Sequence, residues 1–235
     1  PMPTLSEELE TLALKYETRL GHTSGMVRWC IYKRVFPSRM RRWCTDQLKI
    51  KTIRAYLKTV DYPVNCIGIR AAESVARSKL PERELSTSLD CMIWRPLIDW
   101  SKQDVIAIHH RHGLAPNPLY LNGADRVGCW PCIFSRKSEV RYIAETDSAR
   151  INLIRDLEVD LTEVARAHLK PGEQLKHDRT FFMQRGSMSY PPTIDAAVSW
   201  SKTSRGGKQS TLFRDDETEP GCLSWGLCDT GDSNG

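Results

Sequence analysis

The chain has 235 residues, of which 40% are hydrophobic and 27% are charged, as is ordinary for a globular protein whose core needs no disulfide staples. The net charge of +5 suits anionic substrates or nucleic acid but is diagnostic of neither. No apolar run reaches the ~20 residues of a membrane helix, and no signal-peptide pattern opens the chain, so we expect a soluble, cytoplasmic protein.

The first half of the chain reads as helices followed by a short strand. A helix is expected after an N-cap at Thr4 or Ser6, whereas residues 22–40 read as irregular and basic. A second helix is predicted over about 45–59, and Val64–Ile69 reads as a buried strand. A turn or short helix follows over 71–77, then a polar loop over 78–89.

The second half begins with a strand at Met92–Trp94 and continues with helices. Asp99 or Ser101 is expected to cap a helix that runs to about His110, and prolines then predict an extended loop up to Tyr120. Two further helices are predicted over about 136–146 and 148–169. Because strands alternate with helices, we expect an α/β fold with a mostly parallel sheet.

The cysteine pattern suggests a metal site. Cys129 and Cys132 form a C-x2-C turn, which points two sulfurs at one spot, and the polar tail carries Cys222 and Cys228. With Cys44, these residues offer enough thiolates for a zinc site or an iron–sulfur cluster. One alternative is that a single cysteine pair binds metal and the other cysteines are incidental, and another is a redox disulfide between Cys129 and Cys132. Cys30, Cys66 and Cys91 sit singly and are interpreted as buried structural thiols.

A candidate anion site follows the predicted strand at 64–69. Arg70 and Arg77 are charged forks suited to phosphate or sulfate, Ser74 adds a donor, and Glu73 is placed to hold an arginine. Loops at the carboxyl ends of strands bind ligands in open α/β sheets. An equally weighted alternative is a solvated surface turn with an i,i+4 pair between Glu73 and Arg77.

A second basic segment, Arg39–Lys49, surrounds Cys44. Its positive charge would favour either a polyanionic nucleotide or a negatively charged thiolate cluster. An exposed basic loop is the alternative interpretation.

Together these motifs resemble the phosphoadenosine phosphosulfate (PAPS) reductase family, within the PP-loop adenine-nucleotide alpha-hydrolase superfamily. The later part of the chain resembles the phage and mobile-element branch. The residues that carry the resemblance are Arg42-Trp-Cys44 with Lys49, Gly68-Ile-Arg70 with Glu73, Ser74 and Arg77, Trp94, Pro96-Leu97, Asp99-Trp-Ser101, Asn117-Pro-Leu-Tyr120, Gly123 and Arg126-x-Gly-Cys129-x2-Cys132.

The resemblance implies a Rossmann-like sheet that binds ATP or another adenine nucleotide. The implied substrate-binding residues are Lys49, Gly68, Arg70, Glu73, Ser74, Arg77 and Arg126. Iron–sulfur members hold a 4Fe–4S cluster, which here implies Cys44, Cys129 and Cys132 with Cys222 or Cys228 as the fourth ligand, because Trp43 replaces one cysteine of the family pattern. Zinc is the alternative metal.

The family's first strand and Ser-Gly-Gly-Lys-Asp-Ser phosphate loop do not precede the first helix of this sequence. We therefore expect three regions: an N-terminally incomplete nucleotide-binding α/β domain over 1–135, a helical region over 136–200 and a polar tail with its cysteine pair over 201–235. The interpretation is that the phosphate loop is either lost or lies outside this sequence.

Two functional hypotheses follow. The first is a PAPS-reductase-like oxidoreductase or sulfurtransferase, with its catalytic residue unidentified and a homodimer conceivable. The second is a non-catalytic, metal-stabilised module on a degenerate PP-loop fold, which would serve a nucleic-acid or nucleoprotein partner in a mobile-element or defence system.

Overall fold

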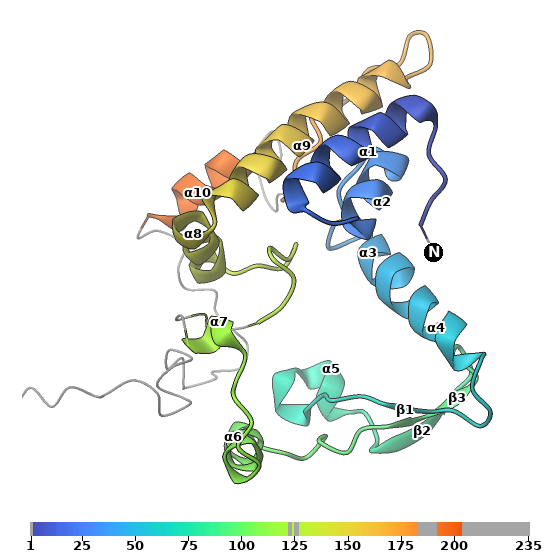
Figure 1. The fold of residues 1–235 in the computed structure, drawn as a ribbon, viewed down its shortest axis with the longest axis vertical. Coiled ribbons are helices and arrows are strands. Elements are labelled where there is room, and N and C mark those ends of the chain that lie inside the picture. Colours follow the sequence, from blue (N-terminus) through green and yellow to red (C-terminus); the bar gives the residue numbers. More distant parts are fainter. Residues whose placement is uncertain (1, 122–123, 125–126, 183–191, 204–235) are drawn as a thin grey trace, which may run out of the picture. The chain divides into compact units, whose positions relative to one another are not determined.

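The computed structural model describes residues 2–121, 124, 127–182 and 192–203, which form two compact units (Figure 1). Of these residues, unit 1 contains 2–49 and those from 124 to 203, and unit 2 contains 50–121. Each unit has its own elements and its own buried side chains.

Unit 1 is helical. Its helices are α1 (Glu7–Leu20), α2 (Gly25–Lys33), α3 (Trp43–Thr45), α8 (Lys137–Thr146), α9 (Ser148–Ala167) and α10 (Ile194–Ser201). The predicted helices near 136–146 and 148–169 are therefore confirmed as α8 and α9. Asp147 separates them because its side chain accepts a hydrogen bond from the backbone N–H of Arg150 (2.9 Å), which caps α9.

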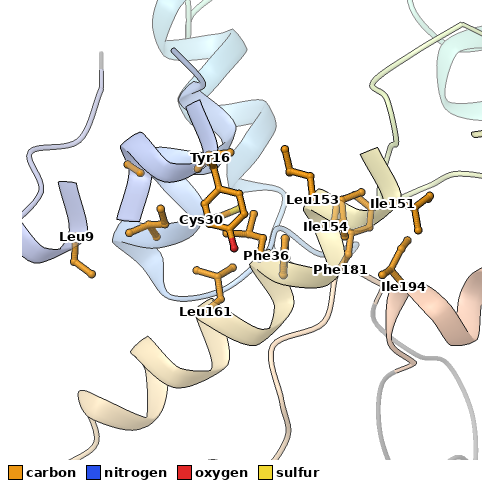
Figure 2. Packing of buried hydrophobic residues seen from close by; sticks show 14 of the residues in the cluster. Leu9, Tyr16, Cys30, Phe36, Ile151, Leu153, Ile154, Leu161, Phe181 and Ile194 are labelled. Atoms are coloured by element: carbon orange, nitrogen blue, oxygen red, sulfur yellow. The ribbon is translucent and has the colours of Figure 1, made fainter. Parts of the chain in front are cut away.

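The core of unit 1 forms where α9 packs with α1 and α2 (Figure 2). Tyr16 is fully buried, and its hydroxyl donates a hydrogen bond to Asp160 on α9 (2.5 Å). Burial of each large apolar side chain contributes about 1.5–3 kcal/mol. The residues of this core are Leu9, Ala13, Tyr16, Val27, Cys30, Ile31, Phe36, Ile143, Ile151, Leu153, Ile154, Leu157, Leu161, Phe181 and Ile194.

Unit 2 carries the sheet. A π-helical turn, η1 (Asp46–Ile50), precedes it in the chain. The strands are β1 (Val64–Cys66), β2 (Arg83–Ser86) and β3 (Cys91–Trp94), and the helices are α4 (Lys51–Leu57), η2 (Ala71–Glu73), α5 (Val75–Ser78), α6 (Lys102–Arg111) and α7 (Pro118–Leu121).

The sheet has the strand order β1–β3–β2. β1 runs parallel to β3, with Val64 opposite Met92, whereas β2 is antiparallel, with Leu85 opposite the same methionine. The expected α/β class and its helical C-terminal part are confirmed, and a parallel pair lies beside an antiparallel edge strand. Cys91 and Ile93 are buried on one face of β3, while Met92 is exposed on the other.

Five expectations from the sequence were wrong. The buried strand predicted at Val64–Ile69 ends at Cys66, and the side chains of Val64 and Cys66 are exposed. Residues 22–40 were expected to be irregular but contain α2. The Ser24 hydroxyl caps this helix by accepting a hydrogen bond from the backbone N–H of Val27 (3.4 Å), and Val27, Cys30 and Ile31 are buried on one side of it. The polar loop over 78–89 contains β2, an edge strand that needs no apolar alternation to pair with β3. The extended loop before Tyr120 contains α7. Cys66 is exposed, while Cys30 and Cys91 are buried as expected.

Within the described ranges, no helix is both long enough and apolar enough to span a bilayer.

Candidate functional site

In unit 2, the loops that follow β1 and β3 are joined by backbone hydrogen bonds. The backbone N–H of Ile67, just after β1, donates to the carbonyl of Trp94 (2.8 Å), and the N–H of Ala71 donates to the carbonyl of Ile98 (2.7 Å). The loop that begins at Gly68 therefore lies beside the one that follows β3. This is the edge at which open α/β sheets bind ligands.

Within the first loop, Glu73 organises the two arginines. Its carboxylate forms an ion pair with Arg77 and lies 3.8 Å from Nε of Arg70. It also accepts a hydrogen bond from the backbone N–H of Arg70 (3.4 Å), and Ser74 caps α5 by accepting from the N–H of Arg77 (3.2 Å). The expected Glu73–Arg77 pair is confirmed. Because Glu73 offsets one of the two arginines, the side chains of Arg70, Glu73, Ser74 and Arg77 together carry a net charge of +1.

These groups are accessible from solvent. The side chains of Arg70, Glu73 and Arg77 are 22%, 29% and 44% exposed. A partly exposed guanidinium can exchange water for the oxygens of a phosphate or sulfate without losing its ion pair, because it has five N–H donors. The arrangement can bind one anionic group, and Glu73 limits how much negative charge it attracts.

Arg95 is a neighbouring arginine that the sequence reasoning did not select. It follows β3, its side chain is 5% exposed, and it contacts the Pro81 carbonyl (2.8 Å) and the Glu84 carboxylate. Its Nε is buried and has no hydrogen-bond partner among the described residues. The position of an arginine directly after a predicted strand is the signal that would have found it.

The predicted metal ligands that the structure describes all lie in unit 1. Cys44 is in α3, and Cys129 and Cys132 are in a turn in which the Cys132 N–H donates to the Ser135 hydroxyl (3.0 Å). The Trp130 indole in the same turn donates to Asp147 (2.9 Å), which anchors the turn at the start of α9.

The Arg39–Cys44 segment and the Cys129–Cys132 turn lie next to each other. The guanidinium carbons of Arg39 and Arg42 are each 5.2 Å from the ring centroid of Phe134, two residues after Cys132. Cys30 also lies near Cys44. Burial, and secondarily the charge of Cys44, raises the pKa of the Cys30 thiol, which keeps it neutral.

A complete metal site is not assembled by the described part of the chain. Across those residues, no three metal-ligating side chains gather into one group. Cys44, Cys129 and Cys132 are free thiols. Cys222, Cys228 and Arg126 lie outside the described residues. Lys49 belongs to unit 1, whereas the Arg70–Arg77 loop, called the anion loop below, belongs to unit 2. The described residues therefore do not by themselves fit a four-thiolate cluster or a zinc ion.

A family model described as the phosphoadenosine phosphosulfate reductase domain matches residues 3–135. An uncharacterized 37.8 kDa protein of Escherichia phage 186 is 32% identical over 211 residues, which cover 85% of this chain and 63% of the phage protein. An uncharacterized protein of Methanocaldococcus jannaschii is 28% identical over 58% of this chain and 34% of its own length.

A shorter match links the chain to a relative with a named activity. The adenosine 5'-phosphosulfate reductase of Allochromatium vinosum is 40% identical over 65 residues, which cover 28% of this chain and 25% of that protein. This chain thus spans less than two thirds of the length of each of these relatives. No solved structure matches it significantly.

Proposed function

The chain belongs to the phosphoadenosine phosphosulfate reductase domain family, and on that premise we propose that it binds an adenine nucleotide carrying a phosphate or sulfate group and takes part in reduction or transfer of sulfur. The observation that carries the proposal is the Arg70–Arg77 loop, which lies at the carboxyl edge of the parallel β1–β3 pair. The relative from Allochromatium vinosum is an adenosine 5'-phosphosulfate reductase, which supports the same substrate class.

In this proposal Arg70 and Arg77 bind the oxygens of the anionic end, and Glu73 orients both guanidinium groups. Gly68 leaves the backbone accessible where the loop leaves β1, and Ser74 fixes the start of α5. The roles of Lys49, which belongs to unit 1, and of Arg126, which lies outside the described residues, stay predictions from the sequence. The group that performs the chemistry is not assigned.

Replacement of the two loop arginines tests the nucleotide site. We expect Arg70→Ala/Arg77→Ala to weaken binding of adenosine 5'-phosphosulfate at least about tenfold, because charge-assisted hydrogen bonds to the anion are lost. The measurement is isothermal titration calorimetry with the full chain. Arg111→Ala, which removes an exposed arginine at the end of α6, is the control and should bind like the unchanged protein. Equal affinity of the double variant and the control would reject this site.

We also propose that Cys44, Cys129 and Cys132, with Cys222 or Cys228, hold a 4Fe–4S cluster, with zinc as the alternative. The support is the proximity of the Cys44 segment to the C-x2-C turn, through Arg39, Arg42 and Phe134. When bound, such a cluster would supply electron transfer.

Anaerobic purification with iron, sulfide and zinc analysis tests the metal. We expect about four iron atoms per chain, a visible absorbance band, and loss of both in Cys129→Ser/Cys132→Ser. Cys66→Ser is the matched control, because Cys66 is an exposed thiol in unit 2. A colourless protein with one zinc would remove the iron–sulfur assignment, and a metal-free protein would remove the ligand set.

A further inference from the structure

We propose that unit 1 carries a surface that binds the phosphate backbone of nucleic acid, formed by Arg39, Arg41, Arg42 and Arg179. The residues of this arginine surface belong to unit 1, whereas the anion loop belongs to unit 2. The inference therefore stands independently of the proposed nucleotide chemistry. It also favours the hypothesis of a nucleic-acid partner.

A tight turn presents the first three arginines. The N–H of Ser38 donates to the carbonyl of Arg41 (3.1 Å), and the N–H of Arg41 donates back to the carbonyl (3.1 Å) and the hydroxyl (3.0 Å) of Ser38. Ser38 is 5% exposed, whereas Arg41 and Arg42 are exposed. The buried serine therefore anchors a turn whose arginines face solvent.

Phe134 holds two of these arginines. The guanidinium carbons of Arg39 and Arg42 both lie 5.2 Å from its ring centroid, which is within cation–π range. An aromatic ring positions a guanidinium without neutralising it. The two side chains are thus placed with their charge intact.

Arg179 joins them from a distant part of the sequence. Its backbone N–H donates to the hydroxyl of Thr162 on α9 (2.8 Å), which fixes its position. Phe181, two residues later, packs edge to face against Phe36 with ring centroids 5.5 Å apart, which brings this segment to the part of the chain that leads into Arg39. Burial lowers the pKa of Arg179, and the positive charge of Arg41 lowers it further. Nε of Arg179 is buried and has no partner among the described residues.

Five other arginines of unit 1, namely Arg19, Arg28, Arg150, Arg155 and Arg166, each form an ion pair with an aspartate or a glutamate. The guanidinium of Arg141 instead donates to the backbone carbonyl of Ser201. Across the described ranges, none of the four arginines of the proposed surface forms an ion pair with a carboxylate. A cluster of like charges without counter-charge destabilises the fold unless an anionic partner neutralises it.

The chemistry of the partner follows from the number and type of the side chains. A mononucleotide offers its charge at one end, where one pair of guanidinium groups suffices. The backbone of nucleic acid repeats its phosphates along the strand and is contacted by several arginines at once. Because contacts from arginines to phosphates carry no sequence information, we expect binding that is independent of sequence and depends strongly on salt.

Neutralising the two repelling arginines tests this inference. We expect Arg41→Gln/Arg179→Gln to weaken binding of a fluorescently labelled single-stranded oligonucleotide at least about tenfold at low salt. The slope of the logarithm of affinity against the logarithm of salt concentration should become less steep by about 1.5, because two phosphate contacts are lost. Fluorescence anisotropy over about 50–300 mM salt provides both numbers for the full chain.

The matched control is Lys15→Gln/Arg19→Gln, which removes two positive charges from ion pairs on α1. It should bind nearly as well as the unchanged protein. The melting temperature of Arg41→Gln/Arg179→Gln should stay the same or rise, because a repulsion is relieved. Equal weakening by the control, no binding by the unchanged protein, or a clear fall in melting temperature would each overturn the inference.

The two sites are distinguished by exchanging ligands. Arg70→Ala/Arg77→Ala should keep its affinity for the oligonucleotide, and Arg41→Gln/Arg179→Gln should keep its affinity for adenosine 5'-phosphosulfate. Loss of oligonucleotide binding in the loop variant would assign nucleic acid to the anion loop and reject the arginine surface.

Discussion

At the scale of single residues, Glu158 is a buried carboxyl group in the core of unit 1. It lies on α9 with 5% exposure and accepts hydrogen bonds from the backbone N–H groups of Phe181 (2.8 Å) and Ile194 (3.0 Å). The side chains of these two residues are part of the core (Figure 2). One carboxylate therefore ties the segment after α9 and the start of α10 to the centre of unit 1.

Burial raises the pKa of Glu158 from 4.5 to about 7, although the two backbone hydrogen bonds lower this pKa in part. The negative charge of Asp195 raises the pKa further, and the positive charge of Arg155 lowers it. Because the folded form holds the proton more tightly than the unfolded form, its contribution is fully present below about pH 4.5 and is lost as the pH rises through 7. The loss amounts to about 3 kcal/mol.

Glu158→Gln should flatten this pH dependence, since the amide keeps an acceptor oxygen but cannot ionise. Urea unfolding at pH 5 and pH 8 measures the effect as a change in the free energy of unfolding. Glu163→Gln, an exposed residue on the same helix, should leave the pH dependence intact. If Glu158→Gln and the unchanged protein lose stability in parallel between these pH values, another group is responsible.

At the scale of elements, Arg28 joins α1 to α2. Its guanidinium contacts Glu17 (2.8 Å) and is bidentate with Glu10 (2.7 and 2.9 Å), and Glu17 also accepts from the N–H of Ser24 (2.7 Å). Hydrogen bonds from Arg28 hold the pKa of Glu17 below its usual value, although its burial opposes this. The Arg28–Glu17 ion pair thus sets the orientation of α2 relative to α1.

Arg28→Ala should destabilise the protein by about 3–5 kcal/mol at pH 7, because it leaves the buried Glu17 carboxylate without its counter-charge. Arg19→Ala removes an arginine from a more exposed pair with Asp156 and should cost less than about 1 kcal/mol. Thermal unfolding of both variants makes the comparison. Similar small losses would show that the α1–α2 connection does not depend on this ion pair.

At the scale of the whole molecule, the family match over residues 3–135 draws on both units. Unit 1 supplies the helical core and the predicted metal ligands Cys44, Cys129 and Cys132, while unit 2 supplies the sheet and the anion loop. In the described part of unit 2 the buried hydrophobic residues are Leu57, Cys91, Ile93 and Ile98. The proposed regions at 1–135, 136–200 and 201–235 remain predictions, as do the roles of Lys49, Arg126, Cys222 and Cys228.

The sequence by itself determined the elements whose apolar residues recur at a regular period. α9 is the clearest case, because its stripe from Ile151 to Leu161 is visible in sequence and is buried as expected. The anion loop could also be predicted from the sequence. The Glu73–Arg77 pair joins residues four positions apart, and the order of the chain places the loop after a strand. Local spacing and chain order are properties that a sequence carries directly.

Only the tertiary structure decided the features that join distant segments. β2 is a strand because β3 offers it a hydrogen-bonding edge, not because its own residues alternate. The backbone of Arg179 is positioned by Thr162 on α9, 17 residues earlier in the chain. Glu158 is a buried acid because the backbone N–H groups of Phe181 and Ile194 bond to it in the core. Burial and the proximity of charges arise from contacts between residues far apart in the chain, so they cannot be predicted from a local sequence pattern.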